Sequence, residues 1–598
     1  MTGARQGAGV RRCGTWMAAV LAFTWAAGAS AADRIRIEID GVDGAIRDNV
    51  RGYLALTRFA QRDDLTDAQV RRLADRAVDE AADALRPFGY YAPTVKSRTS
   101  WDDPQWIVRL RIKPGDPVLM ESVKVQISGP GSAEPALAAI APASALQAGA
   151  RLDHAAYEQL KTDLIRTALG LGYLDAKLTR RELLVDPPRR SASALLELDT
   201  GGQYRFGEIT IEQDFIDHEL VMRLVRFRTG AVFSNDRLRS TQFALEDSNY
   251  FSAVRVVPGR RDPDTLTVPV TIDAERNRRD RFTVSLGYGT DTEIRGRFAW
   301  DNRRVNSRGH RSRIELTGSS VLQEVIGRYV IPVGDPALEK LEFSAGYINE
   351  ELGDVDSERV ETTAGLTQAM GQWQRVLFAR LQNERSSYPD GTRTEDLLLI
   401  PGVSYASMPP NFLTGWVRDA AYYVEVSGSP ETLGSDASYL RFYGRAERVW
   451  PIGGPWYVRL RGEFGTSWVN DFSELPASQR FFAGGDRSVR GFALDELSPP
   501  PEQITLPTPI DTSNKGVGGE HKVVGSIEIE RDLPGNFRIA AFYDTGNAFN
   551  DWSTPLEYSV GIGVRWRLPM LLIGIDVAQA LSEPDRRPRL HLNITQVL

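Results

Sequence analysis

The chain has 598 residues, of which 42% are hydrophobic and 25% are charged, and its formal net charge is −7. This length exceeds that of one ordinary domain, and the negative balance excludes a globally basic protein of the kind that binds nucleic acid. The composition would suit a soluble protein, but it does not exclude a membrane β-barrel, because barrel strands alternate apolar and polar residues.

The first 31 residues (1–31) predict a secretory signal peptide. A positively charged start precedes an apolar core of about 12 residues, which is shorter than the roughly 20 that span a membrane. An A-x-A motif predicts cleavage after Ala31, with cleavage after Ala32 as the alternative. The only cysteine, Cys13, lies inside this segment, so we expect no disulfide in the exported chain. No long apolar run follows, and an exported protein with this sequence would enter a membrane only as a barrel.

Residues 33–275 contain a weak repeat, marked by a helix that ends in Gly or Asn followed by an aromatic residue. The marker occurs at Gly89, Gly172 and Asn249, and each of these residues suits the left-handed C-cap of a helix. Apolar residues at helical spacing precede each cap, two alternating strands follow it, and a strand opens the next unit. The period of about 80 residues is that of a domain rather than a solenoid. We therefore predict three α+β domains of the order β-α-α-β-β, at residues 33–113, 114–200 and 201–275.

This unit resembles the POTRA domain, the periplasmic module of outer-membrane assembly and secretion barrels. The stretch Ile39–Val50 is similar to the start of the first such domain in the translocation and assembly module family. Three unrelated α+β domains are the alternative interpretation of the repeat.

From residue 276 to residue 598 the helical period disappears and short alternating segments take over, as at 282–288 and 560–566. The strands of a soluble β-domain also alternate apolar and polar residues. However, many such segments follow one another without helices, and aromatic residues recur near their ends, which favours an apolar face toward lipid and a charged face toward a wet lumen. At roughly 20 residues per strand and connection, the segment fits 16 strands, an even number as in bacterial barrels. We predict a 16-stranded antiparallel transmembrane β-barrel over 276–598.

One segment, Arg480–Phe492, interrupts the barrel pattern, and a long connection rich in Pro, Thr, Asp and Gly follows it. Connections of this length are usually functional or disordered. It falls between the eleventh and twelfth candidate strands, which is extracellular if both termini are periplasmic. Its core resembles the sixth-loop signature of the POTRA–barrel assembly superfamily, and the wider segment resembles the translocation and assembly module branch. The core residues are Val489, Arg490, Gly491 and Phe492.

A second segment is similar to the F-x-D-x-G strand motif of the same superfamily, through Phe542, Asp544 and Gly546. Alternation on this strand places Asp544 toward the lumen, where a loop folded inward would bring Arg490 against it as a bidentate pair. Gly491 would let the loop pass close to the wall. The resemblance implies the same contact, whereas the alternative is a solvated loop arginine.

A third match is the strand Gly561–Trp566, and Arg565 and Asp576 share the lumenal face of the last strands. Their pairing stays open at this point. The five histidines are scattered, and the chain has no H-E-x-x-H, G-x-S-x-G or Walker motif. The sequence therefore gives no reason to expect an enzyme, a metal or a cofactor.

The resemblance implies an outer-membrane protein with a periplasmic POTRA arm, which promotes insertion of outer-membrane proteins, notably autotransporters, without ATP. The implied partners are unfolded outer-membrane clients, outer-membrane lipid and an inner-membrane-anchored, periplasm-spanning protein of the TamB type, with no nucleic acid. The alternative is a two-partner secretion pore for one dedicated exoprotein, a family that usually has two POTRA domains and a plug helix. A third hypothesis is the principal essential assembly factor, but that family is characterised by five POTRA domains on a longer chain.

Overall fold

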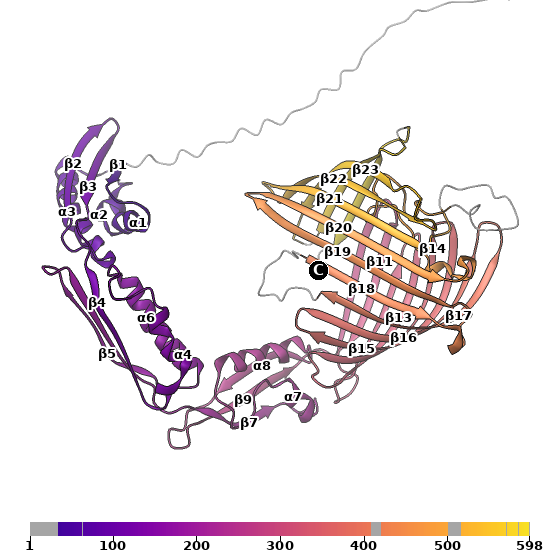
Figure 1. Cartoon of the computed structure of the whole chain (residues 1–598), viewed down its shortest axis with the longest axis horizontal. Coiled ribbons are helices and arrows are strands. Elements are labelled where there is room, and N and C mark those ends of the chain that lie inside the picture. The colour runs from indigo at the N-terminus through magenta and orange to yellow at the C-terminus, as the bar shows by residue number, and fades with distance from the viewer. Residues whose placement is uncertain are drawn as a thin grey trace, which may run out of the picture. The chain divides into compact units, whose positions relative to one another are not determined.

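The computed structural model describes residues 34–62, 64–407, 420–499, 516–569, 571–583 and 585–596. The predicted signal peptide (1–31) and its cleavage site at Ala31 lie outside the described residues. The chain divides into two compact units, the first ending at Gln203 and the second starting at Tyr204. We describe each unit by itself (Figure 1).

The first unit contains two α+β domains of one topology, in which helices cover one side of a three-stranded sheet (Figure 1). In each sheet the last strand lies in the middle, parallel to the first strand and antiparallel to the second. The first domain comprises β1 (Ile35–Asp40), α1 (Gly44–Tyr53), α2 (Ala55–Phe59), α3 (Asp67–Leu85), β2 (Thr94–Asp102) and β3 (Gln105–Lys113). The second comprises β4 (Leu119–Ser128), α4 (Pro135–Ala138), α5 (Ile140–Ala143), α6 (His154–Gly170), β5 (Lys177–Asp186) and β6 (Ser191–Asp199).

The third domain opens the second unit and has the same sheet order. Its core packs the two helices on the sheet through Leu220, Leu245 and Ile272. The prediction of three β-α-α-β-β domains is confirmed, although the first helical segment of domains one and two is split into short pieces. In domain two, Pro135 and Pro142 keep the helices short, because an α-helix tolerates proline only in its first turn. The third domain comprises β7 (Arg205–Glu212), α7 (His218–Leu224), α8 (Asn235–Asp247), β8 (Phe251–Pro258) and β9 (Thr267–Arg276).

The three predicted caps have the left-handed conformation, with φ of +83° at Gly89, +87° at Gly172 and +59° at Asn249. The aromatic residue after the cap is buried in the second and third copies, as Tyr173 and Tyr250. Glycine and asparagine adopt positive φ at a low steric cost, so they end the helix. The chain then reverses, and the aromatic residue packs into the core.

The cap turns of the first and third copies also contact the next domain. In the first unit, Val118 donates its backbone N–H to the carbonyl oxygen of Gly89 at 2.8 Å. In the second unit, the hydroxyl of Tyr250 donates to the carbonyl oxygen of Gly309 in a barrel turn at 2.7 Å. Arg226 adds an ion pair with Asp335 of another turn. The third domain is thus joined to the barrel by defined polar contacts.

The rest of the second unit is a closed barrel of sixteen antiparallel strands, which confirms the predicted number and arrangement (Figure 1). Residue 276 belongs to β9, so the barrel strands begin four residues later than the predicted boundary. The strands are β10 (Asp280–Gly289), β11 (Glu293–Asn302), β12 (Arg311–Gly318), β13 (Leu322–Pro332), β14 (Glu339–Leu352), β15 (Val355–Met370), β16 (Trp373–Ser387), β17 (Arg393–Ser407), β18 (Ala420–Ser429), β19 (Tyr439–Gly453), β20 (Trp456–Val469), β21 (His521–Leu533), β22 (Phe537–Phe549), β23 (Glu557–Arg567), β24 (Leu571–Ala580) and β25 (Arg589–Gln596).

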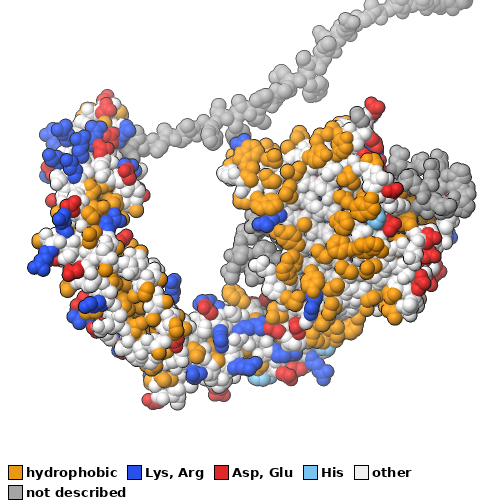
Figure 2. Space-filling view, in the orientation of Figure 1, with side chains coloured by type: hydrophobic (Ala, Val, Ile, Leu, Met, Phe, Trp, Pro, Cys, Tyr) orange, Lys and Arg blue, Asp and Glu red, His pale blue; other side chains and the backbone are white. Residues whose placement is uncertain are grey.

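Alternation gives the barrel an apolar outside and a polar inside. On β22, Phe537, Ile539 and Tyr543 are exposed, whereas Arg538 and Asp544 are buried in the interior. Figure 2 shows hydrophobic side chains spread over the visible wall of the barrel. Among the described residues, no helix is both long and apolar enough to cross a bilayer.

The barrel closes at a seam between its first strand, β10, and its last strand, β25. Only Tyr288 and Gly289 of β10 are registered with β25, opposite Ile594 and Asn593. By contrast, all of β10 from Asp280 to Gly289 is registered with β11. Within the described residues, most of β10 therefore has strand pairing on one side alone.

Candidate functional site: a loop inside the barrel

The described residues 470–499 of the connection between β20 and β21 fold back into the barrel. Val489 and Phe492 are fully buried there. They belong to an apolar cluster with Phe481, Ala483, Leu497, Val524, Ala548 and Ala580. Because the last three of these residues lie on barrel strands, the cluster attaches the loop to the inner wall.

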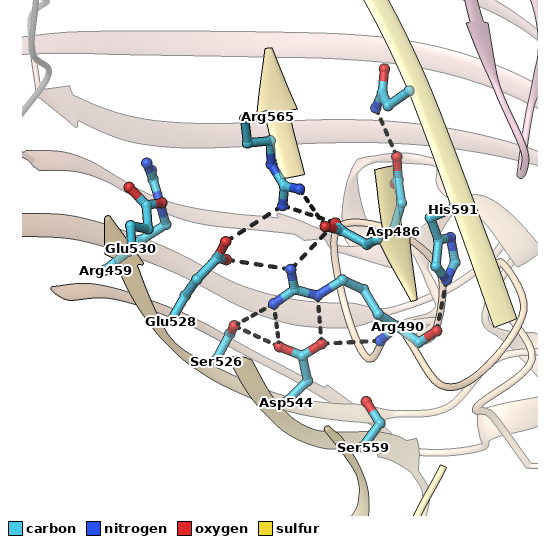
Figure 3. Close-up of polar contacts among 12 residues, drawn as sticks. Arg459, Asp486, Arg490, Ser526, Glu528, Glu530, Asp544, Ser559, Arg565 and His591 are labelled. Carbon is cyan, nitrogen blue, oxygen red and sulfur yellow. Dashed lines mark hydrogen bonds and ion pairs between the residues drawn. The ribbon is translucent and has the colours of Figure 1, made fainter. Parts of the chain in front are cut away.

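Arg490 and Asp544 form a bidentate pair in the centre of this site (Figure 3). The Nε of Arg490 donates to Oδ2 of Asp544 at 2.7 Å, and its Nη2 donates to Oδ1 at 2.8 Å. The backbone N–H of Arg490 also donates to Oδ2 at 3.2 Å. One carboxylate therefore holds both the side chain and the backbone of the loop. We refer to Arg490 and Asp544 as the loop lock.

Further charges surround the loop lock. Nη1 of Arg490 lies 3.3 Å from Oε2 of Glu528 and 3.5 Å from Oδ2 of Asp576. Arg565 donates from Nη2 to Oδ2 of Asp576 at 2.8 Å, which settles the pairing that the sequence left open. Figure 3 shows the guanidinium groups of Arg490 and Arg565 on either side of the Glu528 carboxylate. With Arg461, which interacts electrostatically with Asp544, Arg490 and Glu528, the cluster comprises three arginines and three carboxylates.

Burial makes this arrangement energetically demanding. Arg490 is 2% exposed and Asp544 is fully buried, so neither group is solvated by bulk water. Burial lowers the pKa of the Arg490 guanidinium, but hydrogen bonding and charge attraction from Asp544 and Glu528 outweigh it and raise that pKa above its ordinary value. Removing one partner of such a pair typically costs about 3–5 kcal/mol, because the other charge is left buried and unpaired.

Two further residues place the loop against the wall. The guanidinium carbon of Arg490 lies 3.2 Å from the ring centre of Phe542, a cation–π contact. A Cβ on Gly491 would lie 2.7 Å from the Cβ of Ser559 and 2.9 Å from the backbone nitrogen of Ala580. Only glycine brings the loop backbone this close to β23 and β24.

The structure brings most of the sequence-predicted residues together. Val489, Arg490, Gly491 and Phe492 lie on the loop, and Asp544 and Phe542 lie on the wall that Arg490 touches. Gly546 differs, because a Cβ added to it would meet Val523 and Val524 of the adjacent strand β21 rather than the loop. This glycine allows close packing within the wall.

Among the residues that contact Arg490 and Gly491, sequence reasoning did not identify Ser526, Glu528, Ser559 and His591. Strand alternation carried a signal for each of them, since each lies on the interior face of its strand. It could not say which interior residues a loop from elsewhere would reach. In the described part of the chain, no group of three or more His, Cys, Asp or Glu residues is arranged to hold a metal ion.

Comparison with known protein families gives three matches. The Omp85 superfamily domain matches residues 419–596, and the POTRA domain described as TamA domain 1 matches residues 36–114. The POTRA family described as surface antigen variable number repeat matches residues 204–276.

The individual proteins and structures that resemble this chain have low sequence identity to it. The outer membrane protein assembly factor BamA of Nitratidesulfovibrio vulgaris is 20% identical over 376 residues, which are 59% of this chain and 45% of that protein. The match therefore spans less than half the length of that relative. The crystal structure of BamA from Haemophilus ducreyi lacking POTRA domains 1–3 has a TM-score of 0.64 at 14% identity, covering 80% of this chain and 99% of that one. CdiB from Acinetobacter baumannii has a TM-score of 0.44 at 14% identity, over 89% and 99% of the two chains.

The family matches cover the first and third α+β domains and the part of the barrel from residue 419 to residue 596. The chain therefore contains an Omp85 superfamily domain and POTRA domains, the domain set of an outer-membrane barrel with its POTRA arm in the periplasm.

Proposed function

We propose that this protein is the barrel subunit of a translocation and assembly module. It promotes insertion of other outer-membrane proteins, notably autotransporters, without ATP. The observation that carries the proposal is the seam, where β10 has only two residues registered with β25. The match of the first domain to TamA domain 1 supports this branch of the superfamily.

The seam supports insertion through the free edge of β10. From Asp280 to Gly287, β10 is registered with β11 alone among the described residues. Backbone N–H and C=O groups without partners are costly in the hydrocarbon layer, at several kcal/mol each. A client strand that pairs with this edge would satisfy those groups, as in β-augmentation.

The periplasmic arm offers a second place for an extended chain. β1 is an edge strand of the first sheet, and a groove of about 870 Å³ runs along it. Charged residues from α1, Arg47 and Arg51, line the groove together with Glu38 and Asp40 of the strand. We propose that the arm receives unfolded clients and binds an inner-membrane-anchored partner of the TamB type.

A disulfide across the seam tests the insertion mechanism. Tyr288 and Ile594 are opposite each other, so Tyr288→Cys with Ile594→Cys would join β10 to β25 in a Cys13→Ser background. We expect the oxidised protein in proteoliposomes to lose insertion of an unfolded autotransporter barrel, and a reductant to restore it. The control pair joins Tyr347 to Val360 in the wall between β14 and β15 and should leave insertion unchanged.

Full insertion with the seam oxidised would refute the mechanism. Crosslinking of the full-length protein, followed by identification of its partners, tests the assignment to the translocation and assembly module branch. We expect to recover a large inner-membrane-anchored protein. Recovery of one secreted exoprotein would instead favour a two-partner secretion pore.

A further inference from the structure

We propose that the loop inside the barrel also holds the two edges of the seam together, through a second set of contacts that does not use the side-chain pair of Arg490 and Asp544. This set comprises Asp291, Asp486, His591 and Asn593, and we call it the seam latch. The inference rests on the proposed function, because it names what controls the opening of the seam through which clients would enter.

The first arm of the seam latch joins the loop to the β10 side. Asp291 lies in the turn between β10 and β11, and its Oδ2 accepts a hydrogen bond from the backbone N–H of Asp486 at 2.8 Å. The Asp291 side chain is buried. A Cβ on Gly485, where φ is +91°, would lie 3.0 Å from the same oxygen, so a glycine allows this approach.

The second arm joins the same loop to β25. Asn593 donates from Nδ2 to Oδ2 of Asp486 at 3.0 Å. His591 lies 2.7 Å through Nε2 from the carbonyl oxygen of Arg490. Because a carbonyl oxygen can only accept, Nε2 carries the proton in this contact. Asp486 therefore lies between the two edges, bonded to β25 by its side chain and to the β10 turn by its backbone.

The seam latch is placed where strand pairing is missing. Beyond the registered pairs, the edges are joined by Thr290, which donates from its backbone N–H to the carbonyl oxygen of Leu592 at 3.1 Å. Arg295 of β11 reaches across to Oδ1 of Asn593 at 3.0 Å. Side chains and the loop thus replace the ladder of backbone hydrogen bonds that joins other strand neighbours.

The two sets of contacts differ in strength. The loop lock has a bidentate charged pair at 2.7 and 2.8 Å. In the seam latch, Arg589 lies 3.6 Å from Oδ1 of Asp291 and the Nδ1 of His591 lies 3.7 Å from its Oδ2, both beyond hydrogen-bonding distance. An opening force at the seam would therefore break the seam latch first and leave the loop anchored on β22.

Distance measurements across the seam test the inference without any client. Spin labels are placed at Leu286 of β10 and Leu590 of β25, which both face lipid, in purified protein in bilayers. We expect one short distance in the parent protein and an added, longer population in Asp291→Ala. The matched control is Asp390→Ala, a carboxylate that bonds within its own turn between β16 and β17, and it should leave the distances unchanged.

An exchange of partners separates a latch from a merely structural role. In an Arg295→Gln background, which removes the cation bonded to residue 593, Asn593→Asp places a carboxylate against Asp486 and should open the seam by repulsion. Adding Asp486→Asn restores a carboxylate–amide pair in the reverse sense and should close it again. Each variant is first checked for the heat-dependent gel mobility of a folded barrel. Should one variant fail to fold, the other still gives a result.

Unchanged seam distances in folded Asp291→Ala or in folded Arg295→Gln with Asn593→Asp would overturn the inference. So would failure of Asp486→Asn to close the seam that Asn593→Asp had opened. The readout does not depend on client insertion, so the proposed function and the seam latch can fail separately. Loss of client insertion with normal seam distances would refute only the former.

Discussion

Two strand neighbourhoods of the same barrel contrast sharply. Between β21 and β22, every residue from His521 to Leu533 has a registered partner, and the wall there binds Arg490. Between β10 and β25, two residues on each strand are registered. The barrel therefore combines a fixed wall with a weak seam, and one loop contacts both. We propose that clients enter at the β10–β25 seam, and that the loop anchored on the β21–β22 wall controls this seam.

The largest effect is expected from Arg490→Ala. The substitution leaves Asp544 buried without its bidentate partner, so we expect a loss of about 3–5 kcal/mol in unfolding free energy and loss of client insertion. Urea unfolding of the folded barrel and the proteoliposome assay measure the two effects. The double variant Arg490→Ala with Asp544→Asn removes this stranded charge and should recover part of the stability. Wild-type insertion by Arg490→Ala would reject the loop lock.

A smaller effect is expected from Gly491→Ala, which adds a Cβ within 2.7 Å of the Cβ of Ser559. Overpacking of this kind costs about 1–3 kcal/mol and should displace the loop from the wall. Gly462→Ala is the matched control, because the nearest atom to its added Cβ lies 3.9 Å away. Equal unfolding free energies for the two variants would contradict the fit of loop and wall.

Hydrogen exchange measures the contrast directly. We expect backbone amides in Asp280–Gly287 of β10 to exchange more than about tenfold faster than those in β22, a difference of about 1.4 kcal/mol in opening free energy. Mass spectrometry of peptides from the two strands gives the rates. Equal protection would show that the seam is as firmly closed as the wall.

The smallest effect is expected away from both regions. Tyr250→Phe removes the hydrogen bond to Gly309 that joins the third POTRA domain to the barrel, at a cost of about 0.5–1.5 kcal/mol. Thermal unfolding measures the change, and Tyr543→Phe on the lipid face serves as the control. A seam distance altered by Tyr250→Phe would mean that the joint and the seam are coupled.

The sequence predicted what local rules determine. A glycine or asparagine at a helix end has one favourable conformation there, so the caps at Gly89, Gly172 and Asn249 could be placed without a structure. Strand alternation likewise put Asp544 inside the barrel, because successive side chains point to opposite faces.

The contacts that could not be predicted from the sequence join segments that are far apart in the chain. Glu528 and Ser559 were identifiable as interior residues, but only the path of the loop brings them to Arg490 and Gly491. Asp291 lies in a turn, where alternation gives no direction for a side chain. The residues of the seam latch therefore required the structure.

The most direct test of the account is photo-crosslinking to a client during assembly. A photoreactive residue at Val284 of β10 is compared with one at Val564 of β23, since both face lipid on their strands. We expect an autotransporter client to crosslink at Val284, and the crosslink to disappear when the disulfide of the Tyr288→Cys, Ile594→Cys variant is closed. Equal crosslinking at both positions, or crosslinking at Val284 that persists with the seam closed, would contradict it.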